Sequence, residues 1–372
     1  MPKILFISNT ANFQKFNLPF MRWCLQQGWQ VDYACMGEEP IKECSNSFTI
    51  SITRTPFSIK NLFGYFELKK IIKQNEYDII HCHTPMGGCL GRLAAKKLWK
   101  KNKVKIIYTA HGFHFYKGAP VFNWLVYYPV EKILANYTDV LIVINQEDYQ
   151  IVKERNFKSK SIIKFDGVGV DLERFMPLSE KKMNKFSLRK KYGYDEKDFI
   201  ISVVAECNKN KNQVLLLSNL DKLIANIPKI KILIVGKETL PIARKYVEKR
   251  GLQSYVIFLG YRKDVQYILN LSDILFSGSI REGFGINLVE AMACGIPVVA
   301  SNNRGHRDVV QHGRNGFLFD LNSPDDMVRY ILELYHNKEL CKKFGENNVI
   351  DAQKFSVSVA VEKMAKIYKS LV

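Results

Sequence analysis

The chain has 372 residues, of which 47% are hydrophobic and 24% are charged. This composition excludes a disordered chain, and the length exceeds what one hydrophobic core normally supports, so two domains are expected. Lysine and arginine number 55 against 36 aspartates and glutamates, a net charge of +19 that calls for an acidic partner or an anionic surface.

The hydropathy pattern is that expected of a protein kept in the cytoplasm. Met1 leads into an apolar run without a signal-peptide pattern, and no apolar stretch is long enough to cross a bilayer. The eight cysteines form no CxxC pair, which favours free thiols in a reducing compartment. His81 and His83 flank Cys82, but neighbouring strand residues point to opposite faces, so this triplet is not expected to chelate a metal.

The first half of the chain alternates between short apolar runs and longer amphipathic segments. Strands are expected at residues 3–8, 30–36, 48–53, 77–81, 104–109, 140–144 and 161–164. Helices are expected at 12–27, 59–73 and 87–101, in an aromatic segment ending near Tyr137, and after the sixth strand. Such alternation predicts a parallel sheet covered on both faces, with ligands at the carboxyl ends of its strands.

Residues 166–177 interrupt this rhythm and are expected to form a hinge. The second half then repeats the same logic, which predicts a second parallel sheet. Its strands are expected at 199–205, 230–236, 256–259, 274–276, 296–301 and 316–320, and its helices at 212–227, 240–250, 265–269 and 286–294, with three more closing the chain. The sequence therefore predicts an α/β fold with domains at 1–170 and 178–354.

The stretch from Ser277 to Ala300 carries the most specific pattern. Gly283 and Gly285 let the backbone turn and approach a ligand closely, and a helix follows directly. The unpaired N–H groups and the dipole of its first turn form an anion site. Glu282 precedes the glycines and Glu290 follows eight positions later. Glu290 is expected to accept ribose hydroxyls, and Glu282 to reach what is attached beyond the phosphates.

This stretch resembles the signature of retaining glycosyltransferases of family 4, in which two glutamates bracket a Gly-Phe-Gly loop. The positions that fit are Glu282, Gly283, Phe284, Gly285, Leu288, Glu290, Ala291, Ala293, Gly295, Pro297 and Val298. The resemblance implies the GT-B architecture, two Rossmann-like domains whose parallel sheets face a central cleft. It also implies that the final helix, about 355–372, crosses back onto the first domain.

The resemblance implies a donor site in the second half. Family members usually have an arginine after the first strand of this domain and a lysine five residues later; Lys211 matches the lysine, whereas Glu206 replaces the arginine. Lys211 is expected to hold the donor diphosphate, on which charge grows during transfer, with Lys209 adding charge and Glu206 orienting a lysine. Backbone groups near Arg262 are expected to pair with the base. The remaining donor-side residues are Gly283, Phe284, Gly285, Ile286, Asn287, Leu288 and Glu290.

The acceptor side is expected in the first half. His111 follows the strand ending at Thr109, where family members often have a histidine, and it is expected to position the sugar or share the acceptor's proton. The helix that opens after His83 offers an N-terminus for an acceptor phosphate. The predicted acceptor-side residues are Asn12, His83, Gly87, Gly88 and His114. The Gly-Gly loop that many family members have after the first strand is absent.

The resemblance implies a retaining hexosyl or N-acetylhexosaminyl transferase, which is expected to be metal-independent. The expected donor is a UDP-sugar, with no further cofactor, since no Asp-x-Asp triplet is present. The expected acceptor is a saccharide or a polyprenyl-diphosphate-linked saccharide of surface polysaccharide synthesis, at the inner face of the membrane. The basic helices at 59–73 and 87–101 suit an anionic membrane; core-facing helices with a solvated basic side are an equal alternative.

Three alternatives stay open. A GT-B nucleotide-sugar epimerase or phosphorylase would share the fold, although no lysine stands out as a pyridoxal phosphate site. A non-enzymatic basic protein could bind nucleic acid, but no zinc finger, RNP-type or helix-turn-helix motif is present, so nucleic acid is not the expected partner. A catalytically silent partner subunit is suggested by Glu206.

Overall fold

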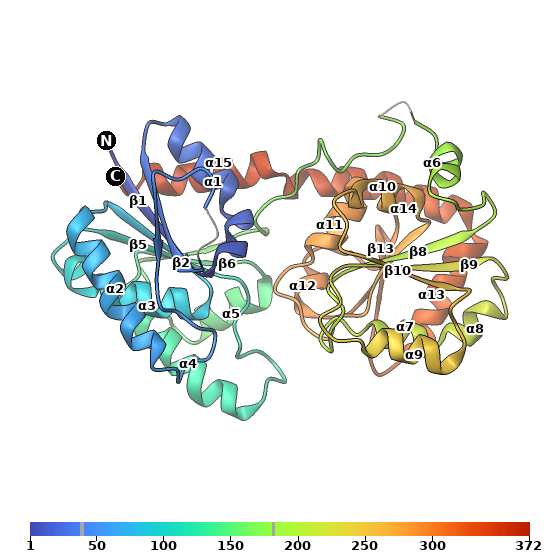
Figure 1. Ribbon diagram of the computed structural model, residues 1–372, viewed down its shortest axis with the longest axis horizontal. Coiled ribbons are helices and arrows are strands. Elements are labelled where there is room, and N and C mark those ends of the chain that lie inside the picture. Colours follow the sequence, from blue (N-terminus) through green and yellow to red (C-terminus); the bar gives the residue numbers. More distant parts are fainter. Residues whose placement is uncertain (38–40, 181–182) are drawn as a thin grey trace. The chain divides into compact units, whose positions relative to one another are not determined.

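The computed structural model describes residues 1–37, 41–180 and 183–372, which form two compact units (Figure 1). Unit 1 comprises Met1–Gly169 and Val357–Val372, and unit 2 comprises Val170–Ser356. Each unit contains one all-parallel sheet with helices on its faces, which confirms the predicted α/β class. The described residues include no helix that is both long and apolar enough to span a membrane.

The sheet of unit 1 has seven strands in the order β3-β2-β1-β4-β5-β6-β7. The strands are β1 (Lys3–Thr10), β2 (Gln30–Met36), β3 (Asn46–Thr49), β4 (Ile79–His83), β5 (Lys105–Ala110), β6 (Val140–Val143) and β7 (Ser161–Lys164). The chain winds outward in opposite directions from β1, so the strand order reverses between β1 and β4. Ligands of such sheets bind beyond the carboxyl ends of the strands at this reversal.

The helices of unit 1 are η1 (Ala11–Phe16), α1 (Leu18–Gln26), α2 (Lys60–Asn75), α3 (Pro85–Lys100), α4 (Val121–Ala135), α5 (Gln146–Glu154) and α15 (Val357–Lys369). The prediction of one helix over 12–27 is wrong, because a turn at Asn17 separates η1 from α1. Pro19 explains the break: it has no N–H for an i→i−4 bond, yet it is tolerated in the first turn of a new helix.

Helix α15 completes the core of unit 1 although it comes from the end of the chain. Its Tyr368 is fully buried, and the hydroxyl lies 2.7 Å from Nδ1 of His81 on β4. The Tyr368 ring also stacks on Trp23 of α1, with centroids 6.0 Å apart. Lys363 of α15 forms a 2.8 Å ion pair with Asp166. The last turns of the chain are therefore part of the packing of the first sheet.

The sheet of unit 2 has six strands in the order β10-β9-β8-β11-β12-β13. The strands are β8 (Phe199–Val204), β9 (Ile230–Val235), β10 (Val256–Gly260), β11 (Ile274–Ser277), β12 (Val298–Ser301) and β13 (Gly316–Phe319). The helices are α6 (Lys185–Lys191), α7 (Gln213–Ser218), α8 (Leu220–Ile224), α9 (Ile242–Arg250), α10 (Val265–Leu271), α11 (Ile286–Ala293), α12 (Arg304–Arg307), α13 (Pro324–His336), α14 (Lys338–Ala352) and the short η2 (Gln353–Phe355).

The single helix predicted over 212–227 is also wrong, since α7 and α8 are separated at Asn219. The Asn219 side-chain amide donates to the Leu215 carbonyl at 3.0 Å, and its backbone N–H bonds Leu216 in a 3₁₀-type turn. An asparagine side chain that bonds the preceding turn competes with regular helical pairing.

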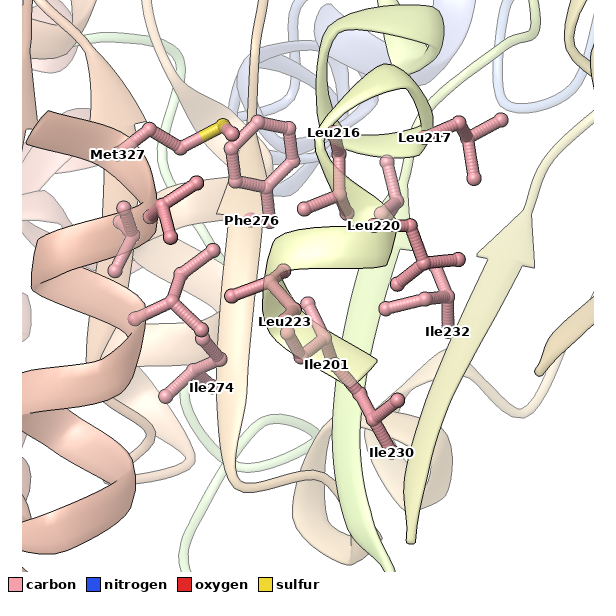
Figure 2. Packing of buried hydrophobic residues seen from close by; sticks show 14 of the residues in the cluster. Ile201, Leu216, Leu217, Leu220, Leu223, Ile230, Ile232, Ile274, Phe276 and Met327 are labelled. Carbon is pink, nitrogen blue, oxygen red and sulfur yellow. The ribbon is translucent and has the colours of Figure 1, made fainter. Parts of the chain in front are cut away.

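A tightly packed core fixes β8 and β11 in unit 2. Ile201 of β8, Ile230 and Ile232 of β9, and Ile274 and Phe276 of β11 face leucines of α7 and α8 and Met327 of α13 (Figure 2). All of these side chains are at most 2% exposed. Loss of one such leucine side chain typically costs about 2–5 kcal/mol. This core therefore holds the two loops that follow β8 and β11 on a rigid base.

Candidate active site

The loop after β11 is anchored from behind by polar groups of the next strand. The Ser279 carbonyl accepts a 2.5 Å hydrogen bond from the Ser301 hydroxyl and a 3.0 Å bond from the Asn303 amide. Ser279 is 1% exposed, so these bonds satisfy a carbonyl that water cannot reach. These bonds fix the backbone just before Glu282-Gly283-Phe284-Gly285, called the glycine loop below.

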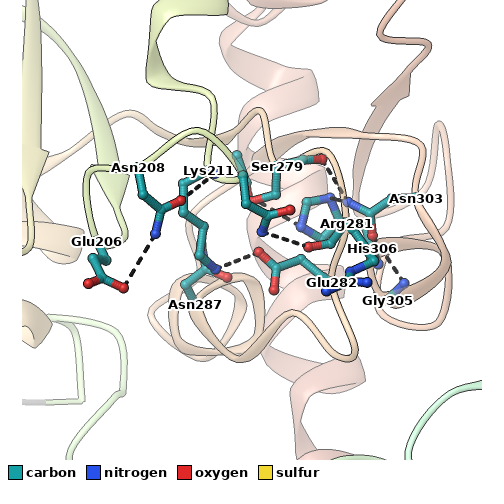
Figure 3. Close-up of polar contacts among 12 residues, drawn as sticks. Glu206, Asn208, Lys211, Ser279, Arg281, Glu282, Asn287, Asn303, Gly305 and His306 are labelled. Atoms are coloured by element: carbon teal, nitrogen blue, oxygen red, sulfur yellow. Dashed lines mark hydrogen bonds and ion pairs between the residues drawn. The ribbon is translucent and has the colours of Figure 1, made fainter. Parts of the chain in front are cut away.

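The loops after β8 and β11 meet at an ion pair. Nζ of Lys211 lies 2.5 Å from Oε1 of Glu282, with 24% and 14% of the two side chains exposed (Figure 3). The Lys211 backbone N–H donates to Oδ1 of Asn208 at 3.0 Å, and the Asn208 amide reaches Glu206 at 3.3 Å. Two of the predicted site residues, 71 positions apart, are thus brought into direct contact. Partial burial strengthens this pair relative to an exposed one.

Helix α11 begins at the end of the glycine loop. Gly285 caps it, and the Asn287 side chain donates to the Val204 carbonyl at the end of β8 at 3.2 Å. The first N–H groups of a helix have no partners within it, so its positive end lies beside the β8 strand end. Glu290 lies on α11 and is partly exposed, whereas Leu288 is fully buried and its N–H donates to the Gly285 carbonyl at 3.0 Å, so Leu288 packs in the core instead of facing a ligand.

A short turn after β12 supports the glycine loop, and sequence reasoning missed it. The Arg304 guanidinium donates to the Glu282 carbonyl at 3.3 Å, and the Asn303 side chain caps α12 by accepting from two backbone N–H groups. A Cβ on Gly305 would lie 2.9 Å from the Cβ and carbonyl oxygen of Glu282. The signal was available, because this polar run directly follows a buried parallel strand.

His306 lies in the same turn and is fully buried. Its Nδ1 is 2.8 Å from the Ser301 carbonyl, and its Nε2 is 3.3 Å from the Ser277 hydroxyl. Burial lowers the pKa of His306 to about 4, although the negative charge of Glu282 opposes the shift. His306 is therefore a neutral ring that ties β11 and β12 together behind Glu282.

Two further predicted donor residues are Lys209 and Arg262. Lys209 is exposed and lines a pocket of about 260 Å³ together with Asn208, Asn212 and residues at the start of α9. Arg262 makes two bonds of 2.7 and 2.8 Å to Asp264 and lowers the pKa of that carboxyl to about 2. The Arg262 guanidinium is thus paired with Asp264. This leaves the backbone groups of the turn for the predicted contact with the base.

In unit 1, three histidines gather at the carboxyl ends of β4 and β5. His81 bonds the hydroxyls of Tyr368 and Thr109, at 2.7 and 2.9 Å. Nδ1 of His83 lies 3.2 Å from Nε2 of His111, and the Phe13 ring packs edge-on against His111 with centroids 4.7 Å apart. Burial lowers the pKa of His111 to about 4 and that of His83 well below its usual range. The three rings are therefore neutral at physiological pH.

The His83–His111 contact favours one pair of tautomers. Nε2 of His83 is buried and has no hydrogen-bond partner among the described residues. A buried N–H without an acceptor is rarer than a buried acceptor without a donor. His83 therefore carries its proton on Nδ1 and donates to His111, which places the His111 proton on Nδ1. His111 is partly exposed, so this N–H can serve as a donor to a ligand.

The predicted acceptor residues at the start of α3 have structural contacts. His83 is 1% exposed, so its placement favours an effect through His111 over direct contact with an acceptor. Oδ1 of Asn9 already accepts from the Gly87 N–H at 2.9 Å, which uses one donor of the predicted phosphate site. A Cβ on Gly88 would lie 2.2 Å from the Tyr108 ring, so Gly88 permits close packing of α3.

The other two acceptor-side predictions lie nearer the surface of unit 1. Asn12 is exposed on η1. His114 is partly exposed and stacks on Tyr127 of α4, with centroids 4.6 Å apart. Both stay predictions. Within the described ranges, no group of three or more His, Cys, Asp or Glu side chains is placed to hold a metal ion.

Comparison with known proteins identifies the family. Residues 3–145 match the Glycosyl transferase 4-like model and residues 184–349 match Glycosyl transferases group 1. The chain is 42% identical to EpsD of Bacillus subtilis (strain 168), named as a candidate glycosyltransferase, over 99% of this chain and 96% of the relative. It is 29% identical to an Escherichia coli protein named UDP-Gal:alpha-D-GlcNAc-diphosphoundecaprenol alpha-1,3-galactosyltransferase, over 97% and 94% of the two chains.

Solved structures agree on the fold. HepE from Anabaena, crystallised with UDP and glucose, superposes with a TM-score of 0.80 over the full length of both chains at 20% sequence identity. Two Rossmann-like units with parallel sheets, as seen here, are the units of the GT-B fold, which confirms the predicted fold class. The protein therefore belongs to the group 1 glycosyltransferases, the family that the Glu-Gly-Phe-Gly loop and its second glutamate predicted.

Proposed function

We propose that the protein is a metal-independent retaining transferase that moves a hexosyl or N-acetylhexosaminyl group from a UDP-sugar. The acceptor is a saccharide, free or linked to a polyprenyl diphosphate, in surface polysaccharide synthesis. The observation that carries the proposal is the Lys211–Glu282 ion pair beside the start of α11. A cation, a helix N-terminus and a carboxylate in one place suit a diphosphate with a sugar attached to it.

Donor binding would rearrange this ion pair. The diphosphate carries more charge than one carboxylate, so Lys211 turns from Glu282 to the phosphates, and the N–H groups of α11 add to the positive field. Glu282 is then free to accept hydrogen bonds from the sugar hydroxyls. As the bond from the anomeric carbon to the phosphate oxygen breaks, both positive groups stabilise the charge left on UDP. In this scheme Lys211 and the helix fill the role that a metal ion has in other transferases.

Retention follows if the acceptor attacks the face that the phosphate leaves. The acceptor oxygen bonds the anomeric carbon, and its proton passes to the departing phosphate oxygen, so no covalent sugar–enzyme intermediate is needed. His111 in unit 1 would donate its Nδ1–H to a sugar hydroxyl, because its neutral ring is a weak base. The relatives support the substrate classes: one is named for UDP-Gal and a diphosphoundecaprenol acceptor, and HepE was crystallised with UDP.

The experiment is a transfer assay with a panel of UDP-sugars and synthetic polyprenyl-diphosphate-linked sugars in the presence of EDTA. We expect acceptor-dependent UDP release with one donor, and an α-linked product from an α-linked donor. Glu282→Gln should abolish transfer while the protein remains folded. Epimerised or free sugar without an acceptor would instead favour the epimerase alternative, and failure of every nucleotide sugar to raise the melting temperature would contradict donor binding.

A further inference from the structure

Helix α2 exposes large apolar side chains on the face that points away from the sheet. Leu62, Phe63 and Phe66 of α2, together with Phe57 and the N-cap residue Ile59 just before it, are 54–75% exposed. Their spacing places all of them except Phe57 on one stripe of the helix. The opposite face packs inward through Leu68 and Ile72 among others. In the N-terminal half of α2 the buried side is formed by Asn61 and Gly64, so its large apolar side chains lie on the outer face, which is unusual for a helix that faces only water.

Helix α4 repeats this arrangement. Val121, Phe122, Leu125 and Ile133 are 57–72% exposed, whereas Glu131, Leu134 and Ala135 are buried. A buried ion pair fixes which side faces out. Glu131 accepts from Arg92 of α3 at 2.6 Å and from the Tyr108 hydroxyl at 3.0 Å, and Arg92 is fully buried. Because breaking such a buried pair is costly, α4 cannot easily roll to hide its apolar side.

Helix α3 contacts both α2 and α4, so the three form one layer on unit 1 (Figure 1). Its outer positions Lys97 and Lys100, and Lys101 beyond its end, are exposed. Between Asp78 and Glu131 the chain carries no acidic residue. The one acid of α2, Glu67, bonds the Ser51 backbone N–H at 2.6 Å and hydroxyl at 3.0 Å. The layer therefore combines exposed aromatic and aliphatic groups with uncompensated positive charge.

Unit 2 lacks such a concentration among its described residues. Its large exposed apolar side chains are spread over several elements: Met183, Phe186, Leu240, Ile242, Tyr261, Ile280 and Ile350. Exposed apolar groups scattered singly are normal on soluble proteins, whereas a contiguous group marks an interaction surface. The clustering on α2 and α4 thus needs a partner.

We propose that the outer faces of α2, α3 and α4, here called the docking face, bind an anionic lipid bilayer. The apolar side chains of α2 and α4 insert at the boundary between headgroups and acyl chains, and the lysines of α2 and α3 contact lipid phosphates. A second copy of the chain is disfavoured, because two equally basic surfaces repel. A nucleic acid would use the lysines but leave Leu62, Leu125 and Ile133 exposed to water.

The inference deepens the proposed function, since a polyprenyl-linked acceptor would lie in the same membrane, but it can be tested without any substrate. The probe is a vesicle of 70% phosphatidylcholine and 30% phosphatidylglycerol, compared with pure phosphatidylcholine, in a flotation assay at physiological salt. We expect at least about tenfold tighter binding to the anionic vesicle, and partial loss of binding at high salt.

Two variants dissect the face. The triple variant Leu62→Ser, Phe63→Ser and Phe66→Ser should weaken vesicle binding at least about tenfold, as should the double variant Phe122→Ser and Leu125→Ser. Ile350→Ser, which removes an equally exposed side chain from unit 2, is the matched control and should bind as the parent does. In Leu125→Trp, the fluorescence of the added indole should shift to the blue with anionic vesicles.

The outcomes separate the two proposals. Loss of vesicle binding with normal transfer to a water-soluble short-chain acceptor in the serine variants supports the docking face and leaves the transferase function intact. Normal vesicle binding by a protein that transfers no sugar keeps the docking face and overturns the function. Vesicle binding unchanged by both sets of serine substitutions, or a concentration-dependent dimer that they abolish, overturns the docking face.

Discussion

Nζ of Lys211 and Oε1 of Glu282 lie 2.5 Å apart, so the cation best placed for a diphosphate is already neutralised by a carboxylate. If the donor diphosphate binds Lys211 as proposed, it must displace that carboxylate, and this competition would link donor affinity to the freeing of Glu282. The two residues should therefore respond differently to substitution.

Lys211→Ala should weaken UDP binding at least about tenfold, since a hydrogen bond to a charged group contributes about 1.5–3 kcal/mol. Glu282→Gln removes the competitor and should leave UDP affinity equal or higher, while transfer falls about a hundredfold or more. Titration calorimetry with UDP and a transfer assay measure the two effects. Lys249→Ala, which removes an exposed lysine of α9, is the control, and weaker UDP binding in Glu282→Gln than in the parent would contradict the competition.

Isosteric variants should reveal which nitrogen of His111 acts. The amide of asparagine occupies the place of Nδ1 and that of glutamine the place of Nε2. If His111 donates from Nδ1, His111→Asn should keep kcat/KM within about tenfold, whereas His111→Gln should lose about a hundredfold. His83→Asn, which preserves the donor toward His111, should resemble the parent more than His83→Gln does. The reverse order in either pair would argue against the assigned tautomers.

Gly305→Ala should displace the glycine loop and with it Glu282. Its Cβ would lie 2.9 Å from the Cβ and carbonyl oxygen of Glu282 and from the Phe284 N–H nitrogen, so the glycine loop must shift. Overpacking of this kind costs about 1–3 kcal/mol, and transfer should fall at least about tenfold. Gly251→Ala is a suitable control, because it meets no atom within 4 Å but strains a left-handed backbone at φ +66°. Equal transfer activity in Gly305→Ala and Gly251→Ala would show that the short turn after β12 does not position Glu282.

Acid should destabilise unit 1 through its buried histidines. Burial lowers the pKa of His81 to about 3 and that of His83 well below the ordinary 6.5. Below pH 6.5 the unfolded chain takes up protons that the folded chain does not, so stability is complete above that pH and declines as pH falls. Each histidine should lower the free energy of unfolding by about 1–2 kcal/mol between pH 6.5 and pH 5. Urea unfolding at several pH values measures the slope, which should be shallower in His83→Asn; an unchanged slope would refute this origin.

Several elements could be predicted from the sequence because their signals are local. The strands at 30–36 and 161–164 match β2 and β7 in both bounds, since apolar runs between turn residues have few alternatives. Helices α6 and α12 were missed, because they span seven and four residues and depend on tertiary contacts. Arg189 of α6, for example, is held by Asp273 at 2.6 Å, a partner that no local pattern reveals.

The candidate site likewise contains residues that the sequence predicts and residues whose role depends on tertiary contacts. The glycine loop, Lys211 and the two glutamates follow from spacing and family resemblance. The support of Glu282 by Arg304 and Gly305 and the burial of His83 do not, since both depend on which strands lie side by side. Sequence order places His83 at a strand end but cannot tell whether its ring faces a ligand or another side chain.

Tyr368 meets His81 across 287 positions of the chain, and this separation has a consequence for synthesis. On the ribosome the amino-terminal unit is the first to emerge, yet its final helix appears only after all of unit 2 has been made. Until α15 has been made, Tyr368 cannot pack against His81 and β4. The first unit to be started is thus the last to be finished, and a nascent chain stopped short of residue 357 would hold one complete unit and one open sheet.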